Sequence, residues 1–359
     1  MIDFSKFTVG NGAITDLREL IHLTVFKNPD IDLLVTTKTG VKDKQKLDFI
    51  DSLGDVGTSG AGCDPNYSKV VIQGLEKEWN LGDWEIAKHI CYKDIENTLG
   101  EIGINTGTDI ADLSGTPYMD LVIELLRRAV TEMAWRIIWF GDLEAKNVAD
   151  SGILTADVNP KLFNMCNGLW KRLSSIIAEN NHQQTIITAN TDKGDGTATT
   201  YASQKEAIRK EGYALKLVDT LLSDADSRIF DAENASIYMT SSLFKALRSD
   251  VVNHYTKATM PYEQVATGLH LSEYDGVRIV VCDIWDRMIK KYEDTGTCLN
   301  NPHRAIVCNP GNLFVGTNDV DKIPELRCTF DDKDRKNYIY ATSKIDTLVG
   351  EDALVQVAI

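Results

Sequence analysis

The segment GTPYMDLVIELLRRAVTEMAWRIIWFGD, residues 115 to 142, constrains the fold most strongly. Thr116 can cap a helix, and Pro117 suits the first helical position. Apolar residues then recur at helical spacing until Gly141 ends the pattern. A helix over 117–140 would be about 36 Å long, at roughly 1.5 Å per residue. This length is unusual for a globular helix and predicts a structural spine.

One face of this helix carries Leu125, Ala129 and Met133, which we expect to be buried. The segment is not a membrane span, because charged residues interrupt it throughout. These residues are Glu124, Arg127, Arg128, Glu132 and Arg136. The N-terminus lacks a basic start followed by an apolar run, so no signal peptide is expected.

The N-terminal third of the chain predicts an arm and a two-stranded ribbon. Residues 1–30 indicate the arm. Residues 31–41 (IDLLVTTKTGV) and 67–79 (YSKVVIQGLEKEW) indicate two paired strands, and the glycine-rich segment 54–62 lies in the tip that joins them. An isolated two-stranded ribbon is marginally stable in water, so we expect it to rest on a partner.

The remaining pattern favours the α+β class, because its helices come early and most of its strands late. A strand is expected at 84–91, and helices at 160–178 and 203–224, the second interrupted by Gly212. The later expected strands are 235–239, 276–282, 303–308, 312–316, 326–330, 337–342 and 353–358.

The stretch ASIYMTSSLFKALRSD, residues 235 to 250, is a strand, a serine-rich step and a helix. Such a passage could hold a nucleophilic serine. A nucleophile elbow needs glycines around the serine, and MTSSLF has none. Thr240, Ser241 and Ser242 are therefore predicted to cap the helix.

Nothing else in the sequence singles out a chemical site. The glycine-rich tip lacks the Lys-Ser or Lys-Thr of a phosphate loop, and the six histidines show no metal-ligand spacing. The six tryptophans are predicted to lie in the core, and so are Cys91, Cys166, Cys282, Cys308 and Cys328, as small apolar side chains. We therefore expect no catalytic, cofactor-binding or metal-binding residues, no cofactor and no enzymatic activity.

The net charge of −15, from 53 acidic and 38 basic residues, argues against general nucleic-acid binding. The scattered, odd number of cysteines fits a reducing compartment, and the cytoplasm is the expected setting.

The order of these parts resembles the tailed-phage major capsid protein family with the HK97-type fold. The similar stretches are WEIAKHICYKDIENT ahead of the spine, WFGDLEAKNVADSGIL at its end, ASIYMTSSLFKALRSD, and the strands in YDGVRIVVCDIW and RAIVCNPGNLFVG. The chain departs from the family in lacking a proline after the strand in MTSSLF and in its EDTGTCLNN loop.

The resemblance implies a division of the chain into an N-terminal arm (1–30), an extended ribbon loop (31–82), a peripheral domain (83–179 and 321–349) with the spine helix 117–140, and an axial domain (180–320 and 350–359). It implies self-assembly as pentamers and hexamers into an icosahedral shell around packaged double-stranded DNA, without sequence-specific DNA binding. The shell would form in the host bacterial cytoplasm and become the virion capsid. The resemblance implies a separate scaffold or none. A portal and decoration proteins would be further partners, and no membrane is implied.

Two alternatives remain open. An encapsulin-like compartment shares this fold and holds cargo protein instead of DNA. A cytoplasmic α+β enzyme with an unrecognised site would be a discrete monomer or dimer.

Overall fold

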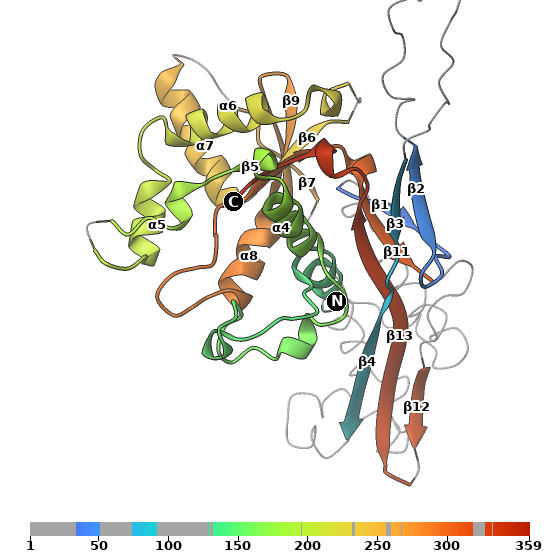
Figure 1. Cartoon of the computed structure of the whole chain (residues 1–359). Coiled ribbons are helices and arrows are strands. Elements are labelled where there is room, and N and C mark those ends of the chain that lie inside the picture. The colour runs from blue at the N-terminus through green and yellow to red at the C-terminus, as the bar shows by residue number, and fades with distance from the viewer. Residues whose placement is uncertain are drawn as a thin grey trace, which may run out of the picture.

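A computed structural model of the chain describes residues 34–50, 74–91, 129, 132–194, 196–231, 234–255, 260–266, 268–318, 327–331 and 333–359. These residues form a mixed α+β structure, as the sequence predicts. Figure 1 shows a three-layer domain of helices around one sheet, with a second, elongated sheet beside it.

The three-layer domain is built on a seven-stranded sheet. Its strands, in pairing order, are β5 (Gln184–Thr185), β14 (Val355–Ala358), β10 (Ala305–Cys308), β6 (Ser236–Met239), β9 (Val277–Cys282), β8 (Leu269–Tyr274) and β7 (Glu263–Ala266). The strands β14, β10 and β6 are buried along their whole length, because helices cover both faces. Alternate residues therefore belong to different cores: Tyr238 faces one, while Ile237 and Met239 face the other.

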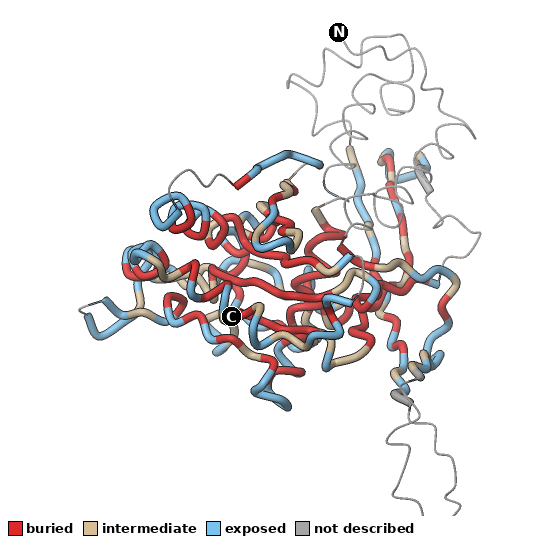
Figure 2. Tube along the Cα trace, turned by 90° about the horizontal axis from the view of Figure 1, so that it is seen from above, coloured by how far each residue is buried: buried red, intermediate tan, exposed pale blue. Residues whose placement is uncertain are grey.

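Helices cover the sheet in two groups (Figure 1). The helical residues 132–140 (not labelled in Figure 1), α4 (Leu169–Glu179) and α8 (Asp283–Tyr292) contribute to one core, and α5 (Tyr201–Ala207), α6 (Tyr213–Asp224) and α7 (Ser241–His254) to the other. Figure 2 shows the buried strands between exposed outer surfaces. The short 3₁₀ turns are η3 (Val148–Asp150), η4 (Pro160–Leu162), η5 (Asn181–Gln183), η6 (Thr188–Asn190), η7 (Ser227–Ile229), η8 (Pro310–Asn312) and η9 (Asp352–Leu354).

A cluster of tryptophans anchors the first core. The ring centroids of Trp139 and Trp285 are 4.6 Å apart, and those of Trp170 and Trp285 are 4.9 Å apart, both in edge-on geometry. All six tryptophans are buried, which confirms their predicted core role. Cys166, Cys282 and Cys308 are also buried as predicted, whereas Cys91 is partly exposed because it ends strand β4.

The elongated sheet is organised around one long strand, β13 (Lys336–Val349). Its first part pairs with β4 (Gly82–Cys91) and β12 (Arg327–Asp331), and its last part pairs with β11 (Leu313–Thr317). Strands β4, β12 and the β13 residues 336–345 form an arm, here called the blade, which extends beyond the helices (Figure 1).

The predicted pairing of 31–41 with 67–79 is wrong. The ribbon consists of β2 (Lys46–Ile50) and β3 (Gly74–Glu78), while β1 (Thr36–Lys38) pairs in parallel with β11. The reason lies in KLDFI, whose Leu47 and Phe49 alternate with polar residues and pack on an apolar cluster of the same chain. The glycine-rich tip at 54–62 and the arm at 1–30 lie outside the described residues.

The spine is described only at residue 129 and over 132–140, all of which are helical. Met133 is buried as predicted, but Ala129 is exposed, so its predicted burial is wrong. Every residue from Met133 to Phe140 is buried. Leu125 lies outside the described part of the chain.

The predicted helix at 160–178 is two elements. Asn159 and Pro160 begin the 3₁₀ turn η4, and α4 starts only after Gly168. Gly168 crosses Gly141 so closely that a Cβ on Gly168 would lie 2.5 Å from the Gly141 nitrogen. The break at Gly212 is confirmed: its φ of 71° separates α5 from α6.

All seven predicted late strands are present, and the sixth is longer than expected. The sequence analysis missed strands β5, β7 and β8 and the whole of helix α8. Helix α8 follows the buried strand β9 without a loop, so its apolar residues continue the apolar run of that strand.

Candidate functional site

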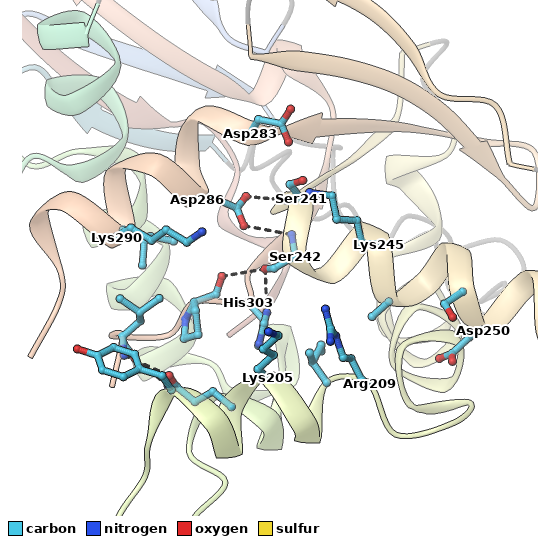
Figure 3. Close-up of a pocket in the computed structure, with 18 residues that line it drawn as sticks. Lys205, Arg209, Ser241, Ser242, Lys245, Asp250, Asp283, Asp286, Lys290 and His303 are labelled. Carbon is cyan, nitrogen blue, oxygen red and sulfur yellow. Dashed lines mark hydrogen bonds between the residues drawn. The ribbon is translucent and has the colours of Figure 1, made fainter. Parts of the chain in front are cut away.

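A pocket of about 880 Å³ lies between α5, α7 and α8 (Figure 3). It contains the serine-rich step that raised the question of a nucleophile. The start of α7 contributes Ser241 and Ser242, and the loop before β10 contributes His303. Helix α8 contributes Asp286, whose carboxylate points at the start of α7.

Ser242 and His303 form a hydrogen-bonded pair. The Ser242 Oγ and His303 Nδ1 atoms are 2.8 Å apart. The backbone of His303 is held by Asn190, whose side chain donates to the His303 carbonyl at 2.8 Å and accepts from its N–H at 3.0 Å. A nucleophilic site needs a serine, a histidine that acts as its base, and a third group that orients the histidine. The identity of that third group therefore decides whether this pair can act as a nucleophile.

Asp286 does not complete a catalytic triad. Its carboxylate accepts the backbone N–H groups of Ser241 at 2.6 Å and Ser242 at 3.1 Å. It therefore caps the N-terminus of α7 and does not orient His303. Among the described residues, no carboxylate accepts a hydrogen bond from the His303 ring.

The capping prediction is right in that the start of α7 is capped, and wrong in the residue that supplies the acceptor. Thr240 is the N-cap residue, but its side chain makes no capping hydrogen bond. Its Oγ1 instead accepts the Arg304 N–H at 3.2 Å, which ties the end of β6 to the start of β10. Asp286 supplies the capping oxygens from 44 residues away, and no local pattern predicts that contact.

Burial sets the ionisation of both groups. Burial lowers the pKa of His303 to about 4, so the ring is neutral at pH 7. Burial also raises the pKa of Asp286, while the N–H groups of Ser241 and Ser242 act in the opposite direction.

His303 should make the folded chain acid-sensitive. In the unfolded chain its pKa returns to about 6.5, so the unfolded state binds a proton first as the pH falls. The contribution of His303 to the free energy of unfolding, about 3 kcal/mol, is fully present above pH 6.5 and is lost as the pH falls from about 6.5 to 4. Over that pH range, the free energy of unfolding of His303→Asn should fall by about 3 kcal/mol less than that of the wild type. Urea unfolding at each pH measures this difference.

Ser242→Ala is the control, because it removes the hydroxyl and leaves the ring buried. It should keep the acid sensitivity of the wild type. Equal pH profiles for wild type and His303→Asn would show that burial of this ring does not set the acid sensitivity.

Two thin extensions are the other candidate functional surfaces. The ribbon is tied to its own chain at its base. Trp79 lies against Gly316, where a Cβ would come within 2.5 Å of the indole ring, and Lys77 pairs with Asp352. The ribbon is therefore anchored on its own chain at one end.

The blade exposes side chains along β4, including Glu85, Lys88 and His89. Tyr340 on β13 is also exposed, opposite Ala87. The blade also contributes Trp84, Ile339 and Ala341 to the first core, so its exposed side chains are the part that offers surface to a partner.

The described residues contain no group of three or more His, Cys, Asp or Glu side chains placed to hold a metal ion. Within the same residues, no helix has the length and apolar character needed to cross a membrane. The sequence named no catalytic, cofactor or metal residue. The sequence also did not single out His303 or Asp286. One signal was available: DIWDRMIKKY has acidic residues in its first turn, apolar residues at helical spacing and basic residues in its last turn, which predicts a helix with Asp286 in its first turn.

No protein-family model matches this chain, and no curated protein matches it. Solved structures do match over most of its length. The satellite phage P4 procapsid including size determination (Sid) protein aligns with 96% of this chain and 98% of its own, at a TM-score of 0.49 and 11% identity. The capsid of an empty GTA particle aligns with 90% of this chain and 93% of its own, at a TM-score of 0.45 and 12% identity. A structure from Gordonia phage Cozz aligns with 91% of this chain and 85% of its own, at a TM-score of 0.47 and 10% identity.

Proposed function

We propose that this chain is the major capsid protein of a tailed bacteriophage, with an HK97-type fold, and that it assembles into an icosahedral shell. The observation that carries the proposal is the combination of one compact three-layer domain with two thin extensions, the ribbon and the blade (Figure 1). One core lies wholly within the compact domain, and the other also includes Trp84, Ile339 and Ile345 of the elongated sheet. The extensions leave much of their surface exposed and gain most by lying against other subunits.

In this proposal the parts have separate roles. The N-terminal arm (1–30) and the ribbon loop (31–82) reach neighbouring subunits. The peripheral domain (83–179 and 321–349) contains the spine and the blade. The axial domain (180–320 and 350–359) contains the seven-stranded sheet and surrounds the symmetry axes.

The partners follow from these roles. Different surfaces of one chain meet on neighbouring copies, and such head-to-tail contacts close into rings. Pentamers and hexamers would then form the shell in the host cytoplasm and become the virion capsid, with a scaffold, a portal and decoration proteins as further partners. A net charge of −15 favours weak contact with the enclosed double-stranded DNA.

Electron microscopy of the purified full chain tests the proposal. We expect closed particles of uniform diameter, or rings that convert to particles when crowding agents are added. Sedimentation velocity run in parallel should show species far larger than a dimer. A chain that stays monomeric or dimeric under every salt and crowding condition would contradict the proposal.

A further inference from the structure

The pocket between α5, α7 and α8 carries charges that its own contacts do not balance. Four basic residues lie around it and are exposed. They are Lys205 on α5, Arg209 in the turn that follows α5, Lys245 on α7 and Lys290 on α8. Figure 3 shows them on both sides of the Ser242–His303 pair.

Two of the three acidic residues of the pocket, Asp250 and Asp286, are engaged by backbone N–H groups of the chain. Asp250 accepts the N–H of Ala214 at 2.9 Å, which fixes the start of α6. A carboxylate oxygen of Asp283 lies 3.0 Å from the Nδ1 atom of His270, and the two form an ion pair only when His270 is protonated. Asp286 caps α7, as described above.

The four basic side chains, in contrast, form no ion pair with any residue that the structure describes. Like charges around one cavity repel one another, and a bound anion would remove that repulsion.

One buried polar atom in the pocket wall also lacks a partner. The Ser241 Oγ atom has no hydrogen-bond partner among the described residues, and Ser241 is only 4% exposed. Buried polar atoms are normally paired with protein, water or a ligand. A hydroxyl is a suitable donor to a phosphate oxygen.

We propose that this pocket binds a small oligophosphate anion, either inorganic or as part of a nucleotide. Basic side chains and neutral donors around one cavity are the groups that hold phosphate oxygens. The volume of about 880 Å³ is within the usual range for small-ligand sites. Ile208, Ile289 and Leu299 line part of the cavity and give it an apolar wall that could accept a base.

The charge of the whole chain makes such binding site-specific. At −15, the chain repels anions in general, so attraction must come from the local field of the four basic residues. Affinity should therefore fall steeply as salt is added, because the basic side chains are exposed to solvent.

Calorimetric titration of the full chain at low salt tests the proposal with sodium tripolyphosphate, ATP and adenosine as probes. We expect tripolyphosphate and ATP to bind and adenosine not to bind. Tighter binding of ATP identifies a nucleotide site, and equal binding identifies an inorganic oligophosphate site.

Two double variants separate the pocket from general charge. Lys245→Gln with Lys290→Gln should weaken tripolyphosphate binding at least tenfold. Lys161→Gln with Lys216→Gln changes the net charge equally at exposed positions outside the pocket, and it should change affinity less than twofold. Ser241→Ala should weaken binding several-fold and leave the unfolding midpoint unchanged, since its hydroxyl has no partner to lose.

Three results would overturn the proposal. One is the absence of binding by either phosphate probe at millimolar concentration. Another is equal weakening by the two double variants. The third has two parts: the wild type binds neither probe, and the double variant Lys245→Glu with Lys290→Glu loses subunit association. That result would identify the pocket as a contact for an acidic surface of a second copy. The calorimetry tests only anion binding, and the electron microscopy tests only shell formation. Either proposal can therefore fail without the other.

Discussion

Replacing Arg304 with methionine should lower the free energy of unfolding of the isolated subunit by about 3–5 kcal/mol. Arg304 is 3% exposed and pairs with Glu293, which is 4% exposed. Its guanidinium also donates to the carbonyls of Asn301 at 2.8 Å and Asn300 at 2.9 Å. The variant leaves two carbonyls without this donor, and it leaves the buried Glu293 carboxylate with Asn300 Nδ2 at 3.2 Å but without a countercharge. A buried unpaired charge is costly.

The aromatic surroundings of Arg304 add to this loss. Its guanidinium carbon lies 5.5 Å from the ring centroid of Phe140 and 5.3 Å from that of Trp170. These residues belong to the end of the spine and to α4, so Arg304 joins the loop before β10 to the first core.

Urea unfolding followed by circular dichroism measures the effect. The matched control is Lys291→Met, which removes the exposed pair with Glu132 and should change stability by less than about 1 kcal/mol. The double variant Arg304→Met with Glu293→Leu should recover part of the loss, because no charge is then left alone. A loss below about 1 kcal/mol in Arg304→Met would show that Glu293 reaches water or another partner in solution.

The elements that the sequence predicted correctly are those with a signal in their own local sequence. Strand β6 and helix α7 were predicted because a run of buried apolar residues is followed directly by a helical repeat, and both signals lie within residues 236–254. The break at Gly212 was predicted because its left-handed backbone suits glycine.

Long-range partners explain what was not predictable. Residues 36–38 have the composition of a strand, but their partner in the sheet is β11, and Thr36 pairs with Phe314. The local sequence of neither segment predicts that the two pair. The pairing of 31–41 with 67–79 followed from proximity in the sequence, whereas the alternation in KLDFI was the better local guide.

The candidate site shows the same limit. Ser242 was examined because of its own neighbours, yet its environment comes from His303, 61 residues away, and from Asp286, 44 residues away. The basic residues of the pocket come from α5, the turn after it, α7 and α8. A site assembled in this way leaves no spacing motif in the sequence.

Replacing residues 51–73 with Asn-Gly should leave a folded subunit that no longer forms closed particles. In the ribbon, Ile50 pairs with Gly74, so a two-residue turn can join β2 to β3 without a change of register. The base of the ribbon stays anchored, because Trp79, Leu81 and Phe314 lie outside the replaced segment and remain clustered. The far-ultraviolet circular dichroism and the urea midpoint should therefore stay close to those of the wild type.

Assembly should respond differently, because in the proposed shell the segment 51–73 reaches a neighbouring subunit. Sedimentation velocity should show single subunits or small rings, and electron microscopy should show no closed particles. A same-length replacement of 51–73 by a scrambled sequence distinguishes the need for specific residues from the need for length, since it keeps the reach and composition of the segment. Full-sized particles formed by the shortened variant would show that this segment has no part in closing the shell, and a shortened variant that fails to fold would show that the ribbon belongs to the core of its own subunit.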